Sequence, residues 1–183
     1  MATDYLRQGP RVAIRHISRQ DYEEIAALRA ESADMLHRWL GARARESTRE
    51  GFESSLARFD QPTHEGFVVC LHGTGAIVGG VNINNIVRGA FQCGTLGYTA
   101  YASTTGRGYL TEGLGLVIEF AFDRLELHRL EANIQPDNTS SLKLVERLGF
   151  RREGYSAAFQ LIDGAWRDHE RWAITDQRPG RRT

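Results

Sequence analysis

The sequence Thr-Gly-Arg-Gly-Tyr-Leu-Thr-Glu at residues 105–112 joins a strand-like segment to a long apolar helical pattern. Gly106 and Gly108 allow a tight turn and let backbone N–H groups approach a ligand closely. The N-terminus of the following helix adds unpaired N–H donors and a partial positive charge. These features predict an anion site that suits a pyrophosphate, to which the Arg107 side chain adds charge. A tight turn without a ligand explains the same residues, so both interpretations stay open here.

Two other phosphate-binding motifs are excluded or disfavoured. A Walker loop requires Gly-Lys-Ser/Thr, and no such triplet follows Gly108. A Rossmann site is disfavoured because the G-x-G-x-x-G spacing is absent and the preceding strand ends an antiparallel meander.

A second polar segment opens another helix downstream. Residues 130–135 alternate between apolar and polar side chains, which predicts a strand. Asn138-Thr139-Ser140-Ser141 then precedes a short amphipathic helix that ends before Gly149, a residue type typical of the position after a helix. Simple capping explains one of these polar residues but does not require the whole run.

The remaining pattern places these two segments in a single α/β domain. Strands are expected at residues 12–15, 67–71, 76–86, 92–101, 130–135, 158–162 and 167–174. Helices are expected from Ser18 to just before Gly41, from Ser47 or Thr48 to before Pro62, at 109–127 and at 139–148. The order predicts a mixed, largely antiparallel sheet of about seven strands flanked by about four helices. Residues 1–176 are expected to form this domain, and 177–183 a polar tail.

Composition narrows the class of protein. The 183 residues include 23 Lys plus Arg and 23 Asp plus Glu, so neither general nucleic-acid binding nor rRNA binding is favoured. Cys70 and Cys93 are expected to be small buried hydrophobes, and no Cys/His spacing suggests a metal. No signal-peptide pattern and no apolar run long enough to span a membrane is present, which favours the cytoplasm.

Taken together, the two polar segments resemble the GNAT acetyltransferases. The order strand, glycine turn, helix, strand, Asn-x-x-Ser, helix and Gly-Phe is the core of that superfamily. Residues 106–112 resemble its RimJ/RimL group, in which a Thr-Glu pair starts the helix. The segments 138–141 and 146–150 resemble the next block of that group, and Gly97-Tyr98 also matches.

The resemblance spans roughly residues 10–175 and has departures. Thr105 stands where Gln or Arg is usual, and Leu110 where Gly or Ala is usual. Gly113 and Gly115 replace helix-forming residues, at a cost of roughly 1 kcal/mol each in a helix interior. Thr105 puts one side-chain contact in question, but backbone N–H groups do not depend on side chains.

The resemblance implies acetyl-CoA as co-substrate and direct attack by an amine, without an acyl-enzyme. Ser141 matches the serine that protonates the CoA thiolate, and Tyr98 is the second candidate acid. An ordinary first-turn serine and a packing aromatic are their structural alternatives. The implied acetyl-CoA contacts are Leu96, Gly97, Tyr98, Gly106, Arg107, Gly108, Tyr109, Leu110, Thr111, Glu112, Asn138 and Ser141.

The expected acceptor amine is inferred from the absence of an obvious general base. No Asp or Glu occurs from Arg88 to Ala102, so no base is obvious there, although Glu131 or Glu153 could supply one. An α-amine has a pKa of roughly 7.7–8 and needs less help from a base than a lysine amine near ~10.4. A peptide or protein N-terminus, including that of a ribosomal protein, is therefore the expected acceptor.

Other acceptors and roles stay open. A small amine such as an antibiotic or polyamine would keep the chemistry, and an inactive CoA-binding sensor would lose it. A homodimer is also open. The helix end containing His37, Arg38 and Trp39 could grip a peptide, although packing of Trp39 in the core is preferred. Packing is also the expectation for the aromatic residues of the last hairpin, which are Phe159, Trp166 and Trp172.

Overall fold

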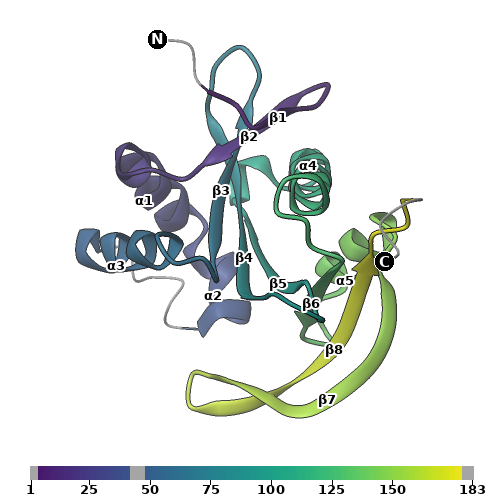
Figure 1. Cartoon of the computed structure of the whole chain (residues 1–183). Coiled ribbons are helices and arrows are strands. Elements are labelled where there is room, and N and C mark those ends of the chain that lie inside the picture. The colour runs from purple at the N-terminus through teal and green to yellow at the C-terminus, as the bar shows by residue number, and fades with distance from the viewer. Residues whose placement is uncertain (1–3, 42–47, 179–183) are drawn as a thin grey trace.

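The computed structural model describes residues 4–41 and 48–178, which form an eight-stranded sheet with helices on both faces (Figure 1). The strands are β1 (Arg7–Gln8), β2 (Val12–His16), β3 (Glu65–Leu71), β4 (Ile77–Val87), β5 (Cys93–Ala100), β6 (Arg129–Ile134), β7 (Arg151–Ile162) and β8 (Ala165–Thr175). The helices are α1 (Tyr22–Glu31), α2 (Ala33–Leu40), α3 (Arg49–Phe59), α4 (Tyr109–Asp123) and α5 (Thr139–Arg147), with short 3-10 helices η1 (Arg19–Asp21) and η3 (Ala102–Thr104).

The sheet has one parallel pair, β5 and β6, and these two strands separate near the middle of the sheet. The strand order is β1-β2-β3-β4-β5-β6-β8-β7, and every neighbouring pair except β5 and β6 is antiparallel. β5 pairs with β6 only over Cys93–Thr95, opposite Arg129–Glu131. Because β5 continues to Ala100, its edge from Leu96 onward has no strand partner on the β6 side.

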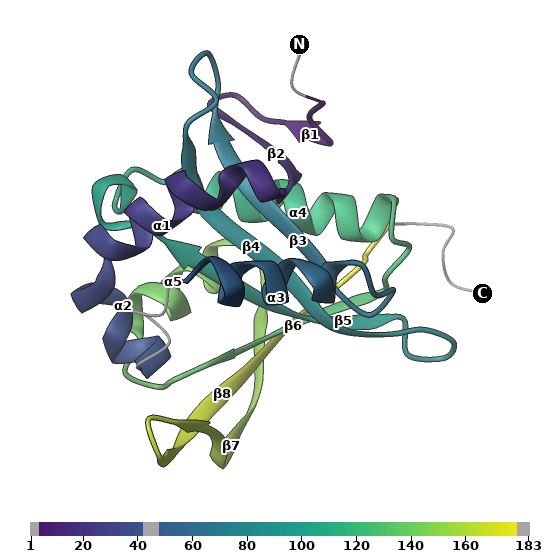
Figure 2. The same ribbon diagram turned by 90° about the vertical axis from the view of Figure 1, so that its left-hand side faces the viewer.

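The helices form two layers. α4 and α5 cover one face of the sheet, and α1, α2 and α3 lie on the other (Figures 1 and 2). Alternate residues of β3 serve the two faces, as the two-residue period of a strand requires. Val69 belongs to the large apolar cluster that includes Leu114 and Val117 of α4. Val68 belongs to a smaller cluster that includes Ile25 of α1.

Helix α4 lies very close to the sheet. A Cβ atom built on Gly113 would come within 2.4 Å of Val69 Cγ1, whereas one on Gly115 would meet only Leu148 Cδ2, at 3.7 Å. Gly113 therefore permits the close approach of α4 to β3, and Gly115 does not serve that purpose. The predicted helix over 109–127 is too long, because the N–H of Leu127 bonds to the carbonyl of Ala121 and leaves the α-helical pattern.

The helix expected from Ser18 to Gly41 is interrupted, which corrects the number of helices from about four to five α-helices in the described residues. The break lies at Ser32, between α1 and α2. The Ser32 hydroxyl donates to the carbonyl of Leu28 at 2.6 Å and accepts from the N–H of Ala102 at 2.9 Å. A serine that bonds to the preceding turn competes with helix continuation, and here it also ties the break to η3.

Two strand predictions are corrected as well. β1 has two residues and carries no pattern of its own, so the expected seven strands become eight. β7 begins at Arg151 rather than at residue 158. Its first residues have weak strand propensity, and their pairing with β8 makes them a strand, with register shifts after Arg152 and Ser156.

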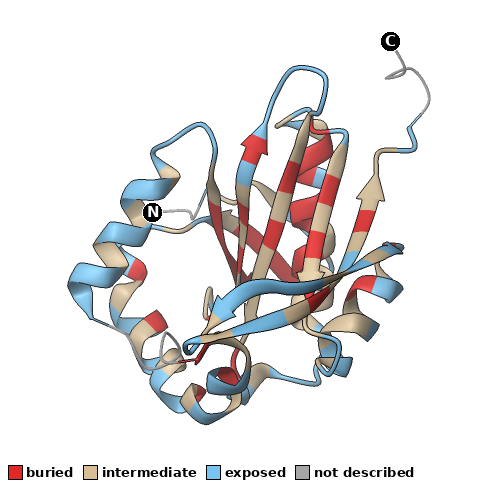
Figure 3. Ribbon diagram, turned by 90° about the horizontal axis from the view of Figure 1, so that it is seen from below, coloured by how far each residue is buried: buried red, intermediate tan, exposed pale blue. Residues whose placement is uncertain are grey.

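The hairpin of β7 and β8 projects from the sheet and is largely exposed (Figure 3). Trp166 is 64% exposed, so the prediction that it packs is wrong. Phe159 is also exposed on one side, but its ring packs on that of the buried His169, with centroids 5.3 Å apart. Trp172 is partly buried against the large cluster, as expected. Of the predicted tail, residues 179–183 lie outside the described residues, while Arg178 forms ion pairs with Asp123 and Asp176.

Candidate functional site

The loop between η3 and α4 presents a row of backbone donors. Gly106 and Gly108 both have φ of +76°, which turns the chain into the first turn of α4. At the start of the loop, the Thr104 hydroxyl donates to the carbonyl of Val78 at 2.9 Å. Within residues 4–41 and 48–178, no acceptor meets the N–H groups of residues 106–111. A helix N-terminus with unpaired donors binds an anion such as a pyrophosphate.

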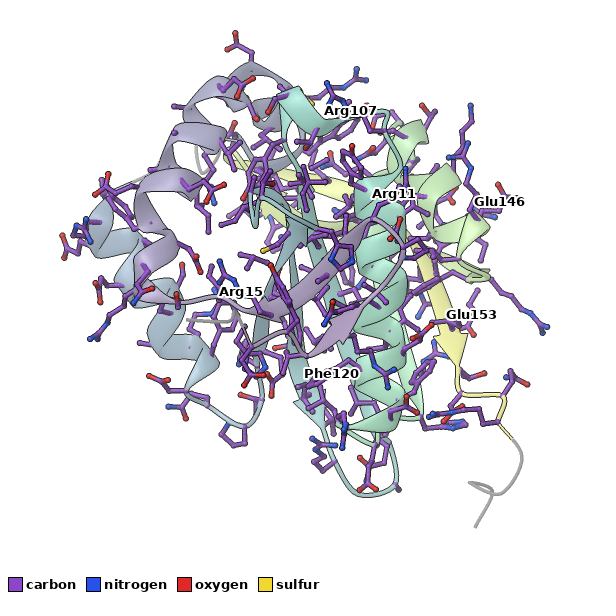
Figure 4. All side chains as sticks on the ribbon, turned by 90° about the horizontal axis from the view of Figure 1, so that it is seen from above. Arg11, Arg15, Arg107, Phe120, Glu146 and Glu153 are labelled. Carbon is purple, nitrogen blue, oxygen red and sulfur yellow. The ribbon has the colours of Figure 1, made fainter. Side chains whose placement is uncertain are left out.

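A brace from the far end of the chain holds this loop. The Arg11 guanidinium donates to the carbonyl of Arg107 at 2.9 Å and to Glu112 Oε2 at 2.8 Å. Glu112 Oε1 accepts from the N–H of Arg11 at 2.8 Å and of Val12 at 3.1 Å. Arg11 and Arg107 lie at the N-terminal end of α4 in Figure 4.

The brace also changes the acidity of Glu112. Burial acts to raise the pKa of Glu112, but the bonds from Arg11 and Val12 outweigh it and lower the pKa. Both carboxylate oxygens are already bound, and the N–H of Glu112 donates to the carbonyl of Gly108. A direct contact of Glu112 with the cofactor therefore stays a prediction, while its contact with Arg11 is observed.

A pair of hydroxyl groups lies beside the separation of β5 and β6. Tyr98 points from β5 and Ser141 from the first turn of α5, with Oη and Oγ 2.5 Å apart. Burial raises the pKa of Tyr98 to about 12, against the opposing effect of the Ser141 hydrogen bond. Tyr98 therefore keeps its proton at neutral pH, so the pair can donate one to a nearby anion.

Asn138 orients the start of α5. Its Oδ1 accepts from the N–H of Ser141 at 3.2 Å and from the Ser140 hydroxyl at 3.0 Å. The capping role considered for this residue is thus confirmed. The cap uses only the Oδ1 atom of this side chain among the described residues, and a contact of Asn138 with the co-substrate stays a prediction. Leu96 is buried in the core, so only its backbone edge faces the separation between β5 and β6.

A cleft of about 830 Å³ lies on the opposite face of the sheet, under α1 and α3. Its walls include Gly80 and Asn82 of β4 and Thr99 of β5. No Asp or Glu is among the described residues that line it, and its charged side chains are Arg29 and Arg58. A second hollow of about 680 Å³ lies at the C-terminal end of α4, where Asp123 and Arg178 pair, away from the hydroxyl pair.

The two glutamates that the sequence offered as a base are engaged elsewhere. Arg129 donates to Glu131 at 2.8 Å and to Glu153 at 3.1 Å. The hydrogen bond from Arg129 lowers the pKa of Glu153, against the effect of burial. Glu153 lies beside the C-terminal half of α4, whereas Arg107 lies at the N-terminal end of this helix (Figure 4). Neither carboxylate has the environment of a general base.

Other predicted features have mixed outcomes. Cys70 is buried, as expected, and burial raises the pKa of its thiol, whereas Cys93 is only half-buried. Arg38 stacks over the Trp39 ring, 4.7 Å from its centroid, and also bonds to Asp137. Trp39 is thus half-buried beneath an arginine rather than packed in the core. Among the described residues, no helix is long and apolar enough to span a membrane, and no group of side chains could hold a metal ion.

Sequence reasoning missed three residues of the site. Arg11 holds the glycine loop from about a hundred positions away in the chain, and Thr104 ties that loop to β4. Asn82 lines the cleft directly opposite Gly97. The asparagines at 82, 84 and 85 in a strand otherwise built of Ile, Val and Gly are the signal that the sequence offered for Asn82.

The chain is similar to known proteins in sequence and in fold. A family model described as "Acetyltransferase (GNAT) domain" matches residues 11–151. "Probable N-acetyltransferase YjcK" of Bacillus subtilis (strain 168) is 30% identical over 172 residues, which are 91% of this chain and 95% of that protein. The ribosomal protein uS5-alanine N-acetyltransferase of Escherichia coli (strain K12) is 42% identical over 107 residues, 57% of this chain and 55% of that enzyme. The structure of Mycobacterium smegmatis RimJ in complex with CoA-disulfide superposes with a TM-score of 0.82 at 30% identity, over 90% of this chain and 81% of that one.

Proposed function

Because the chain belongs to the GNAT acetyltransferase family, which uses acetyl-CoA, we propose that it acetylates the α-amine at the N-terminus of a protein. The predicted GNAT fold is confirmed, with eight strands in the described residues. The observation that carries the proposal is the hydroxyl pair of Tyr98 and Ser141 beside the separation of β5 and β6. Tyr98 packs against the apolar cluster on the α4 side of the sheet, the face that also carries the glycine loop.

The residues on the α4 side fit acetyl-CoA. The unpaired N–H groups of residues 106–111 suit its pyrophosphate, and the space around Gly106 is open, with no atom within 4 Å of a Cβ built there. The free edge of β5 from Leu96 to Tyr98 offers backbone groups to the pantetheine arm and the thioester carbonyl. Acetyl-CoA supplies the acetyl group as a thioester.

The acceptor enters from the cleft on the other face. Its neutral amine attacks the thioester carbon, a carbon–nitrogen bond forms, and the carbon–sulfur bond breaks. The departing thiolate takes a proton from the Tyr98–Ser141 pair, the nitrogen releases one proton to solvent, and the pair regains its proton from solvent. An α-amine with a pKa of roughly 7.7–8 is partly neutral at pH 7, which suits a cleft without a described carboxylate.

The same cleft bears on the alternatives. A polyamine carries several positive charges, and Arg29 and Arg58 in the cleft would repel it. An inactive sensor would not need an intact hydroxyl pair, and this pair is in place. One relative is named as an N-acetyltransferase of an alanine in ribosomal protein uS5, which makes ribosomal proteins the first acceptors to test.

The test is release of CoA thiol from acetyl-CoA with a panel of N-terminal peptides, lysine peptides and small amines, followed by mass spectrometry. Acetylation of the peptide α-amine supports the proposal. Turnover confined to small amines, or to lysine side chains in N-terminally blocked peptides, would contradict it. Acetyl-CoA binding without turnover in any class would favour the sensor instead.

A further inference from the structure

Asn82 and Arg58 line the cleft, and both donate a hydrogen bond to Asn84, the second asparagine along β4. Arg58 of α3 donates to Asn84 Oδ1 at 3.1 Å, and the amide nitrogen of Asn82 donates to the same oxygen at 3.0 Å. A guanidinium can only donate, so it fixes which end of the Asn84 amide faces it. That oxygen in turn requires the amide nitrogen of Asn82. The carbonyl oxygen of Asn82 is left as an acceptor, and no donor among residues 4–41 and 48–178 meets it.

This free oxygen lies at the point where the sheet opens. Asn82 pairs with Gly97 across β4 and β5, one residue from Tyr98. A Cβ built on Gly97 would come within 2.9 Å of Asn82 Oδ1, so the amide packs directly on the Gly97 backbone. Gly97 thus leaves room for the Asn82 amide beside the separation of β5 and β6. An amine that approaches the thioester from the cleft passes this oxygen and can donate a hydrogen bond to it.

The charge beside this point is positive. Arg58 is exposed and lines the cleft, and among the described residues its guanidinium forms no ion pair. Its other N–H groups are therefore open to a ligand. Arg58 and Asn82 donate to the same oxygen of Asn84, at 3.1 and 3.0 Å, so the guanidinium lies close to the Asn82 amide. A group bound to Arg58 and an amine held at Asn82 can therefore belong to the first residues of the same peptide.

We infer that Asn82 and Arg58 form an acceptor subsite that selects N-termini with an acidic side chain at the second residue. The inference rests on the proposed function and adds the substrate class. Asn82 Oδ1 accepts a hydrogen bond from the α-amine. Arg58 binds the carboxylate with two parallel N–H donors, the geometry that a guanidinium offers to that group. Asn84 fixes the positions of the two side chains relative to each other, because its Oδ1 accepts a hydrogen bond from both.

The experiment measures kcat and KM for peptides that begin with Ala and differ only at the second residue, which is Glu, Gln or Lys. The wild type is expected to prefer Glu over Lys by roughly five- to tenfold in kcat/KM, mainly through KM, because one exposed ion pair replaces one like-charge contact. Arg58→Glu is expected to reverse the order, and Arg58→Gln to abolish it. Arg124→Glu, an exposed site at the end of α4 far from the cleft, should leave the order unchanged.

Asn82→Ala separates the two parts of the subsite. It should raise KM for all three peptides by a similar factor, since every peptide has the same α-amine. Acetyl-CoA affinity, measured in parallel for each variant, shows that the fold is intact.

The outcomes are distinguishable. Equal rates for Glu, Gln and Lys peptides, or a Glu preference that survives Arg58→Glu and Arg58→Gln, overturn this inference and leave N-terminal acetylation standing. Acetyl-CoA binding with no acetylation of any α-amine overturns the proposed function and the inference together. A preference for Glu that Arg58→Glu reverses supports both.

Discussion

On the α4 side of the sheet, the groups open to a ligand are backbone N–H groups in a short continuous segment, residues 106–111, shaped by glycines. On the α1–α3 side they are side chains, such as Asn82 and Arg58, that come from separate elements. In the proposed function, the first side holds a co-substrate that is common to the family, and backbone groups are insensitive to substitution. In the same proposal the second side faces the acceptor, where side chains can change specificity without disturbing the fold. The comparison suggests that acetyl-CoA binding and acceptor choice can be altered independently.

The largest effect is expected where the two sides meet. Ser141→Ala should lower kcat by ~100-fold, because the hydroxyl pair loses its part in protonating the thiolate. Acetyl-CoA affinity should change little, since the donors at residues 106–111 remain. Steady-state kinetics and calorimetric binding measure the two quantities. Ser140→Ala, on the exposed face of the same helical turn, is the matched control.

Tyr98→Phe sharpens this test. Because Tyr98 and Ser141 share one hydrogen bond, the double variant should lose little more than either single variant. An unchanged kcat in Ser141→Ala would remove that serine from the mechanism.

The next effect concerns the rigid support of the α4 side. Gly113→Ala should lower the free energy of unfolding by about 1–3 kcal/mol, because the new methyl group meets Val69. Gly115→Ala, two positions away, should raise it by up to about 1 kcal/mol, because its surroundings are open and alanine favours a helix. Urea unfolding followed by tryptophan fluorescence measures both. Similar values for the two variants would show that α4 can shift away from β3.

The same pair of glycines shows what the sequence could predict. Both are departures from the family pattern, and helix propensity assigns them the same cost. Only the distance to Val69 distinguishes them, and that distance depends on how α4 packs on β3. The glycine turn and the capping asparagine were predictable because their signals lie within a few residues.

The acceptor side was less predictable for the same physical reason. Asn82 and Arg58 are 24 positions apart in the chain, and neither belongs to a motif. The exposure of Trp166 depends on how far the last hairpin projects, whereas its residue type alone favours packing. Local signals predict elements and turns, but contacts between distant elements require the fold.

A smaller effect tests whether the glycine loop acts through its backbone. Gly106→Ala should weaken acetyl-CoA binding by roughly five- to tenfold, because a left-handed conformation costs an alanine about 1–2 kcal/mol. No atom lies within 4 Å of the added Cβ, so contact with the protein is not the cause. Gly89→Ala is the matched control, with φ of +71° and equally open space in the β4–β5 turn. It should lose similar stability and keep its affinity for acetyl-CoA. Equal affinity in both variants would show that the loop conformation does not govern binding.

The smallest effect concerns the brace between Glu112 and Arg11 on the α4 side. Because the folded-state pKa of Glu112 is lowered, its carboxylate adds stability above its unfolded pKa, and this stability is lost as pH falls through the folded pKa. Glu112→Gln should therefore be less stable than wild type by about 0.5–1 kcal/mol at pH 7, a value limited by the exposure of Arg11. The difference should vanish in the acid range below the folded pKa, where the wild-type side chain is also neutral. Glu146→Gln, at an exposed site on α5 outside this brace, is the matched control.

Acetyl-CoA affinity in Glu112→Gln then distinguishes the two roles of this glutamate. If Glu112 acts only through Arg11 and the carbonyl of Arg107, affinity at pH 7 should fall by no more than the stability change implies, about two- to fivefold. Arg11→Gln should cause a similar loss, because it removes the other half of the same brace. A much larger loss in Glu112→Gln than in Arg11→Gln would mean that the carboxylate contacts the co-substrate directly. The α4 side would then rely on a side chain as the acceptor side does, and the contrast between the two sides would be weaker.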